Sequence, residues 1–378
     1  MIKEIALITD CEYIVPALVT IRSLKKTMKK DEFFRLNVIY DVLDDSAIEL
    51  FKQEECENIK IVFHECNQRI EEFHFQHLYV SKASILKFFL PDILENCSVV
   101  LYVDSDLLFR EDISSLFSLD INDYYACVVK DMKCTKEGDP ERIGLKNYFN
   151  SGVMLLNLEK MREENISRKL LEYKIKLDSG KFMDQDSLNY VLNEKLKFIS
   201  PMFNSILPFF LEYSEQEIDD FYGEKCRLSE ARIIHFAGAN KPWNDFCSPL
   251  YKEWIDYLNV NTEILFMLKS YEEAFSRHQR QYNALWDINE KREQQIRGID
   301  CELGNQSKKL MQLMDNENKN EEKSLEVKRT IASVVEKTDD NEKTIASVNE
   351  RINETIEAIE QITIWKIIRN SFKKKKGI

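Results

Sequence analysis

Two carboxylates follow directly after a short, strongly apolar run. Residues 99–103 are apolar and mostly β-branched or aromatic, which is typical of a strand buried on both faces of a sheet. Asp104 and Asp106 come next, and a side-chain period of two places both on one side at the strand's carboxyl end. Two anions held so close repel each other and lose hydration, so the pair favours a divalent cation between them. For the pair alone, a solvated turn after a core strand is the alternative.

A histidine ends a second apolar run far along the chain. His235 follows Ile233 and Ile234, and a neutral imidazole would complete a metal site that already has two carboxylates. A structural role is the alternative for a lone histidine. The residues after it favour the metal site, because Gly238 permits close backbone approach and Lys241 supplies a positive charge for a metal-bound diphosphate.

Further polar side chains follow other expected strands. Asp10 ends a strand expected over 5–9, where a carboxylate commonly binds a ribose, and Tyr13 offers a ring on which a base can stack. A helix cap beside a buried tyrosine is the alternative for these two. Asn150 can donate to and accept from sugar hydroxyls, and Gly152 allows a tight approach.

A group of acids stands before an expected helix. Asp184, Gln185 and Asp186 precede apolar residues at helical spacing. Because helix starts often carry acids as caps, capping is the alternative for Asp186.

The elements that must position these residues alternate between strand and helix. This alternation over the first 115 or so residues predicts a mainly parallel, doubly wound α/β sheet. Neither a GxGxxG nor a GxxxxGK[ST] pattern occurs, so something other than a glycine-rich loop must hold phosphates. The expected strands cover 5–9, 36–40, 59–63 and 99–103, and the expected helices 13–30, 46–54 with Ser46 as its cap, and 81–94.

Six blocks of sequence carry a family resemblance in a fixed order. They are ITDCEYIVPALVTIRSL, SKASILKFFLPDIL, LYVDSDLLFREDISSLF, YFNSGVMLLNLEKMREENI, MDQDSLNYVL and IIHFAGANKPW, and they cover about residues 1–260. Together they resemble the retaining glycosyltransferases of family 8, which have the GT-A fold and include glycogenin and bacterial lipopolysaccharide glucosyl- and galactosyltransferases. The resemblance implies a doubly wound mixed sheet and transfer of glucose or galactose from a UDP-sugar to a glycan or lipid-linked saccharide acceptor. It also implies a place in bacterial surface polysaccharide or lipopolysaccharide synthesis.

The resemblance also assigns roles to residues. Asp104, Asp106 and His235 would bind Mn²⁺ or Mg²⁺, which would stabilise the departing diphosphate as a Lewis acid. Asp184 would contact the sugar hydroxyls, and Gln185 would lie beside the anomeric carbon. Glutamine is a poor nucleophile, so we expect the acceptor hydroxyl to attack from the same face while Gln185 stabilises the oxocarbenium ion. The full predicted nucleotide-sugar site is Asp10, Tyr13, Lys87, Asp104, Ser105, Asp131, Asn150, Ser151, Asp184, Gln185, Gly238 and Lys241.

The sequence departs from the usual family pattern in three places. Lys87 stands where the family commonly has Arg, which turns a bidentate sugar contact into a single-point one. Cys11 and Glu12 replace the more usual Asp and Asn, and Ser151 replaces a common Ala. These departures leave the donor sugar open. Acceptor contacts are expected in 132–146 and 201–222, which carry no readable pattern.

The composition changes after the expected transferase domain, residues 1–262. From about 271 to 362 glycine and proline almost vanish and a heptad register persists, with TIASVVEK and TIASVNER two heptads apart. We expect a coiled-coil stalk over 263–362 that forms a homo-oligomer, with a solvated single helix as the alternative. Residues 363–378 form a basic amphipathic tail suited to an anionic membrane, with disorder as the alternative.

Composition limits the remaining function classes. A net charge of −13 over 378 residues argues against nucleic-acid binding. Nine cysteines without CxxC or zinc spacing, and no signal peptide, indicate a cytoplasmic protein, with peripheral contact at the inner face of the membrane left open. A haloacid-dehalogenase-like phosphatase also uses Asp-x-Asp, but Leu107 and Leu108 do not fit it. A coiled-coil scaffold with an inactive transferase-like head is the non-enzyme alternative.

Overall fold

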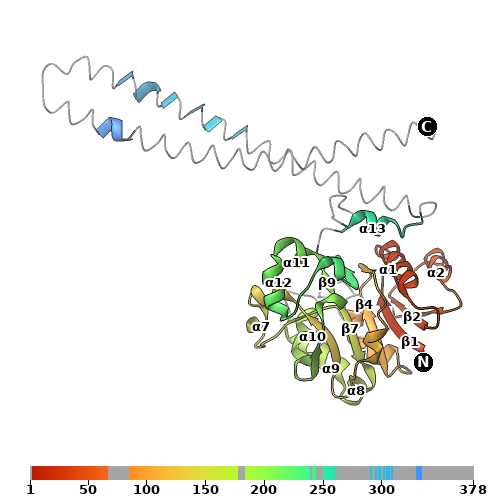
Figure 1. Cartoon of the computed structure of the whole chain (residues 1–378). Helices are drawn as coiled ribbons and strands as arrows, with labels where there is room; N and C mark the ends of the chain where they lie inside the picture. The colour runs from red at the N-terminus through yellow and green to blue at the C-terminus, as the bar shows by residue number, and fades with distance from the viewer. Residues whose placement is uncertain are drawn as a thin grey trace, which may run out of the picture. The chain divides into compact units, whose positions relative to one another are not determined.

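The computed structural model divides the chain into two compact units, Met1–Leu268 and Lys269–Ile378. It describes residues 2–66, 85–177, 184–238, 241–243 and 250–259, Glu263, and short helical stretches between 290 and 333 (Figure 1). Most of the predicted coiled-coil stalk and all of the predicted basic tail lie outside the described residues, and the boundaries expected at 262 and 362 stay predictions. In the described part, no helix is long and apolar enough to cross a bilayer, and every cysteine is a free thiol.

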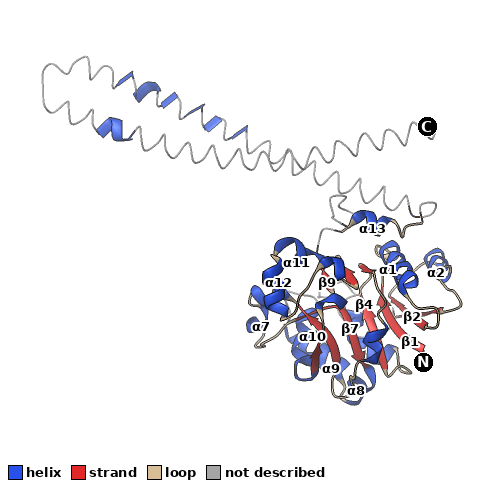
Figure 2. Ribbon diagram, in the orientation of Figure 1, coloured by secondary structure: helices blue, strands red, loops and turns tan. Residues whose placement is uncertain are grey.

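A seven-stranded mixed sheet forms the centre of the first unit (Figure 2). β1 pairs in parallel with β2 and β4, whereas β7 runs antiparallel to both β4 and β6. The predicted doubly wound mixed sheet is therefore confirmed. In spatial order the strands are β3 (Ile59–Glu65), β2 (Phe33–Tyr40), β1 (Ile2–Ile8), β4 (Val99–Val103), β7 (Phe149–Asn157), β6 (Ala126–Lys130) and β8 (Leu196–Phe198).

Helices pack on both faces of this sheet, because its strands are apolar on both faces. Alternate residues of β1 enter opposite cores: Leu7 packs with α1 and α2, and Ile8 packs with the core that includes residues of α8, α9 and α10. The helices of the first unit are α1 (Ile14–Thr27), α2 (Asp45–Lys52), α5 (Leu90–Ile93), α6 (Met132–Lys136), α7 (Asp139–Arg142), α8 (Leu158–Glu163), α9 (Ile166–Leu177), α10 (Gln185–Leu192), α11 (Leu207–Glu212), α12 (Glu215–Tyr222) and α13 (Tyr251–Ile255).

Two local expectations differ from the structure. The cap of α2 is Asp44 and not Ser46, because the Asp44 carboxylate accepts the Ala47 N–H at 2.7 Å. The helix expected over 81–94 is broken where it is described: a 3₁₀ turn, Lys87–Phe89, precedes α5. Pro91 has no N–H to continue an α-helical ladder, which accounts for the break.

After β4 the chain enters a small second sheet, which has the strand order β5-β10-β9. β5 (Leu107–Phe109) begins directly after Asp106 and pairs antiparallel with β10 (Ile233–His235), so that His235 lies opposite Leu107. β9 (Ser205–Ile206) pairs with β10 in parallel. This register brings a histidine from late in the chain beside the two carboxylates.

Candidate metal and sugar-nucleotide site

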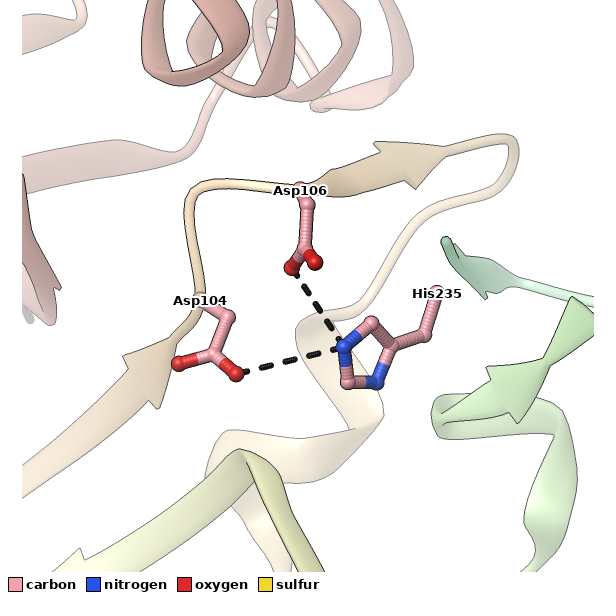
Figure 3. Close-up of side chains that lie close together, drawn as sticks. All are labelled: Asp104, Asp106 and His235. Carbon is pink, nitrogen blue, oxygen red and sulfur yellow. Dashed lines mark ion pairs between the residues drawn. The ribbon is translucent and has the colours of Figure 1, made fainter. Parts of the chain in front are cut away.

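The three predicted metal ligands lie together at the carboxyl end of β4 (Figure 3). His235 Nε2 is 3.3 Å from Asp106 Oδ1 and 3.9 Å from Asp104 Oδ2. All three ligand atoms lie within 4.8 Å of one another, and no other cluster of three such groups occurs among the described residues. One cation can therefore contact all three side chains.

Hydrogen bonds connect the turn that carries the two acids to β7, β1 and α1. The Asp104 N–H donates to the Gly152 carbonyl at 2.8 Å, and the buried Ser105 hydroxyl donates to the Ile8 carbonyl at 2.8 Å. The Thr20 hydroxyl of α1 lies 2.9 Å from the Ser105 carbonyl oxygen. The Ser105 hydroxyl thus holds the turn against β1, and its predicted role at the nucleotide sugar stays a prediction.

Only one oxygen of Asp104 faces the other two ligands. Its Oδ1 accepts hydrogen bonds from the Tyr102 hydroxyl at 2.6 Å and from Lys87 Nζ at 3.0 Å. Burial, together with the Asp104 carboxylate, raises the pKa of Tyr102 well above its ordinary value, so the phenol remains a donor. Oδ2 is left on the side of His235.

Asp106 shows the same division between its two oxygens. Lys241 donates to Oδ2 and also to the Phe236 carbonyl at 2.5 Å. Oδ1 is buried without a hydrogen bond, which is costly for a carboxylate unless a cation contacts it. Burial opposes the ionisation of Asp106, but Lys241 and His235 lower its pKa below the ordinary value.

His235 also presents one ring atom to the carboxylates. Its Nδ1 lies 2.9 Å from Asn204 Oδ1, and Nε2 faces the two acids. Two carboxylates and an imidazole, each with its other polar atom already bound, make a donor set that suits Mn²⁺ and is compatible with Mg²⁺. Asp106 Oδ1, which is buried without a hydrogen bond, would contact such an ion. The residues therefore fit a divalent metal.

A buried lysine joins this metal site to the predicted sugar site. Lys87 Nζ is 3.0 Å from Asp104 Oδ1 and 2.8 Å from Asp184 Oδ2, and Asp184 also accepts from the Ser151 hydroxyl at 3.1 Å. Burial lowers the pKa of Lys87, but the two carboxylates outweigh it and raise that pKa above its ordinary value. Lys87 therefore stays charged between the two acids.

The remaining predicted sugar-side residues form a looser cluster. Ser151 N–H donates to Gln185 Oε1 at 3.2 Å, whereas Asn150 Nδ2 is 3.4 Å from both Gln185 Oε1 and Asp131 Oδ2. Asp131 uses its other oxygen to cap α6, accepting the Cys134 N–H at 2.9 Å. A register shift between β6 and β7 lies beside Asn150, and bulges of this kind re-aim side chains at sites.

Asp10 and Tyr13 lie just before the start of α1. Asp10 Oδ1 accepts the N–H groups of Glu12 and Tyr13 at 3.0 and 3.1 Å, which closes the turn before α1. Asp10 is not the helix cap of the alternative interpretation, because the N-cap of α1 is Tyr13, without a side-chain cap hydrogen bond. Burial, followed by nearby acids led by Asp106, raises the pKa of Tyr13 to about 12. Its ring meets Trp243 edge-on with centroids 5.8 Å apart. The contact of Asp10 and Tyr13 with a nucleotide stays a prediction.

Gly238 has the backbone that its predicted role requires. Its φ is +87°, which L side chains rarely adopt, and no atom of the described residues lies within 4 Å of a Cβ built there. A ligand can therefore approach the backbone at this point.

Comparison with known proteins decides the family. A sequence model of glycosyl transferase family 8 matches residues 4–247, more than half of the chain. The chain belongs to glycosyl transferase family 8. General stress protein A of Bacillus subtilis strain 168 is 30% identical over 223 residues, which make up 54% of this chain and 75% of that protein.

Two further comparisons relate the chain to named transferases. Lipopolysaccharide 1,2-glucosyltransferase of Escherichia coli K12 is 33% identical over 152 residues, or 38% of this chain and 44% of that protein, so under half of its length is matched. The solved structure of the galactosyltransferase LgtC, in complex with donor and acceptor sugar analogues, has a TM-score of 0.59 at 22% identity and covers 67% of this chain and 94% of that chain. This likeness confirms the GT-A fold. The family match, and not the fold, makes the chain a glycosyltransferase.

Several residues at the site of this family 8 chain were not predicted from its sequence. Tyr102 could have been found, since it precedes Asp104 by one strand period. Asn204 and Trp243 carry no local signal of their contacts. Asp186 does not cap α10: it is fully buried, and its Oδ1 accepts from the Tyr148 hydroxyl at 2.6 Å and from Arg142 at 2.7 Å.

Proposed function

We propose that this family 8 enzyme is a metal-dependent, retaining hexosyltransferase. It moves glucose or galactose from a UDP-sugar to a glycan or lipid-linked saccharide in the synthesis of bacterial surface polysaccharide. The observation that carries the proposal is the buried Asp106 Oδ1, which has no hydrogen bond and lies 3.3 Å from His235 Nε2. A nucleotide diphosphate needs positive charge beside it, and this arrangement is suited to hold a divalent cation.

The chain's own groups then divide the work of breaking the sugar–phosphate bond. Asp104, Asp106 and His235 would hold Mn²⁺ or Mg²⁺, which supplies Lewis-acid stabilisation of the leaving diphosphate. Lys241, already buried beside Asp106, adds a fixed positive charge on the same side.

The opposite side of the bond carries developing positive charge on the sugar ring. Gln185 Oε1 is a neutral acceptor that lies 3.2 Å from the Ser151 N–H nitrogen and 3.4 Å from Asn150 Nδ2. A carboxylate nucleophile in this position would form a covalent ester with the sugar. An amide carbonyl oxygen stabilises the oxocarbenium ion without forming that ester. Asp184, which pairs with Lys87, would bind a sugar hydroxyl.

The test is turnover of UDP-sugars in the purified chain. UDP release from UDP-glucose, UDP-galactose and UDP-GlcNAc is measured with Mn²⁺, with Mg²⁺ and after EDTA treatment. We expect metal-dependent hydrolysis of one hexose donor, lost in Asp104→Asn and retained in Asp120→Asn, an exposed acid on a surface turn. A chain that neither binds nor hydrolyses any of the three donors would instead be a scaffold with an inactive head.

We further propose that residues 263–362 form a coiled-coil homo-oligomer, that residues 363–378 contact anionic membrane, and that the enzyme acts in the cytoplasm. The support is the heptad register, the 14-residue repeat and the lysine-rich terminus. Sedimentation of the full chain against a chain ending at 268, with and without anionic vesicles, tests the oligomer and the membrane contact.

A further inference from the structure

A relay of amide groups runs from the backbone of β7 to the metal-site histidine. The Gly152 N–H donates to Asn150 Oδ1 at 3.0 Å, Asn204 Nδ2 donates to the same oxygen at 2.9 Å, and Asn204 Oδ1 lies 2.9 Å from His235 Nδ1. The side chains of Asn150, Asn204 and His235 are each more than nine-tenths buried. No part of the function described above uses Asn204.

The orientation of each amide follows from the first member of the relay. A backbone N–H can only donate, so the atom of Asn150 that faces Gly152 must be the oxygen. Asn204 must then offer its NH₂ group to that oxygen, which turns its own carbonyl toward His235. A carbonyl oxygen only accepts, so Nδ1 of His235 must carry the proton.

This chain of donors and acceptors determines which histidine nitrogen can coordinate a cation. In the neutral imidazole with its proton on Nδ1, Nε2 keeps the lone pair, and Nε2 is the atom 3.3 Å from Asp106 Oδ1 (Figure 3). A hydrogen bond from the second nitrogen of a metal-binding histidine fixes both its tautomer and its ring orientation.

The backbone keeps Asn204 in register with the histidine. Asn204 directly precedes β9, whose Ile206 pairs with His235, and the Asn204 N–H donates to the Pro201 carbonyl at 3.1 Å. The ring also lies against Gly152, where a Cβ would stand 2.3 Å from His235 Cε1. The glycine thus leaves room for the imidazole, and the Asn204 amide fixes which nitrogen carries its proton.

We propose that Asn204 is the positioning residue for the metal ligand His235, and that it couples the cation to Asn150 on the sugar side. The proposal rests on the proposed metal-dependent function and deepens it. Asn204 lies in the segment 201–222, where the sequence suggested acceptor contacts, but its side chain faces the metal ligand instead.

Three variants separate the two ends of the relay. Asn204→Ala removes both hydrogen bonds, whereas Asn204→Asp keeps an acceptor for His235 Nδ1 and loses the donor to Asn150. Asn157→Ala is the matched control, since Asn157 is a buried asparagine at the far end of β7 that caps α8 and donates to the Ile121 carbonyl. Circular dichroism and thermal melting establish that each variant is folded.

The primary readout is the Kd of Mn²⁺ for the full chain without donor, measured by electron paramagnetic resonance of free Mn²⁺. Asn204→Ala is expected to weaken binding by about 10-fold or more. Asn204→Asp and Asn157→Ala are expected to stay within about threefold of the unaltered chain. Asn204→Asp should nevertheless raise the KM for the donor sugar, because Asn150 loses a partner.

A spectroscopic readout tests the tautomer directly. In the Mg²⁺-loaded chain labelled with ¹⁵N-histidine, the His235 signals, assigned through His235→Gln, should show a protonated Nδ1. A protonated Nε2, an unchanged Mn²⁺ Kd in Asn204→Ala, or equal weakening in both Asn204 variants would each overturn the proposal. An unaltered chain that binds no Mn²⁺ at all would instead overturn the proposed metal-dependent function.

Discussion

The two ends of the site differ in how completely their side chains are already bound. At the metal end, each ligand has its second polar atom occupied, by Tyr102 and Lys87, by Lys241, and by Asn204, mostly at 3.0 Å or less. At the sugar end, Gln185, Asn150 and Asp131 face one another at 3.4 to 3.5 Å. The first set is held in place and the second is only loosely connected.

This difference matches what each end has to do. A cation needs ligands that are fixed before it binds, because reorienting buried carboxylates is costly. At the sugar end, the hydroxyl groups of a bound sugar can replace the long hydrogen bonds between the amide and acid side chains. Hydrogen bonds at catalytic groups are often long before substrate binds and shorten in the complex.

The largest expected effect comes from removing a proposed metal ligand. Asp106→Ala removes a ligand and leaves Lys241 buried without its carboxylate, so we expect UDP release to fall by at least about 1000-fold, below detection. The assay is UDP release at saturating Mn²⁺, with Asp120→Ala as the control. Residual turnover above one per cent would show that Asp106 is not a ligand.

The second effect is confined to the sugar end. Gln185→Ala should lower kcat by about 100-fold and leave measurable turnover, because the metal-side groups remain intact. Its Mn²⁺ Kd should match that of the unaltered chain. If Gln185→Ala and Asp106→Ala lost activity equally, the proposed division between the two ends would be wrong.

A third variant tests how tightly the metal end is packed. In Gly152→Ala the new Cβ would stand 2.3 Å from Cε1 and 2.8 Å from Nδ1 of His235, so the ring must move. We expect about 10-fold weaker Mn²⁺ binding, with a loss of about 1–3 kcal/mol in the free energy of unfolding. Gly304→Ala, in a helical stretch where no atom of the described residues lies within 4 Å of the new Cβ, should leave the Mn²⁺ Kd unchanged.

The smallest effect concerns the residue that belongs to both ends. Lys87→Arg keeps a cation between Asp104 and Asp184, so kcat should stay within about threefold while the preference between UDP-glucose and UDP-galactose shifts. Competition between the two donors measures the shift. An unchanged preference would place Lys87 outside the contacts that select the sugar.

Much of the architecture could be predicted because its signals are local. The apolar run at 99–103 predicted β4 to the residue, since a strand buried on both faces needs no partner-specific information. The helix expected over 81–94 was less accurate: its described part is broken by a 3₁₀ turn at Lys87–Phe89, next to Pro91. The cap of α2 also shifted, because Asp44 and Ser46 are both good caps and sequence alone does not rank them.

By itself, the sequence determined the alternating α/β order, the family, and the three residues of the candidate metal site, because strand patterning and motif spacing are properties of neighbouring residues. Only the tertiary structure decided which atom of each ligand is free and that Asn204 faces His235. Those contacts join β4, β7, β9 and β10, strands that meet through sheet register, and no spacing along the chain encodes which side chains will face each other there.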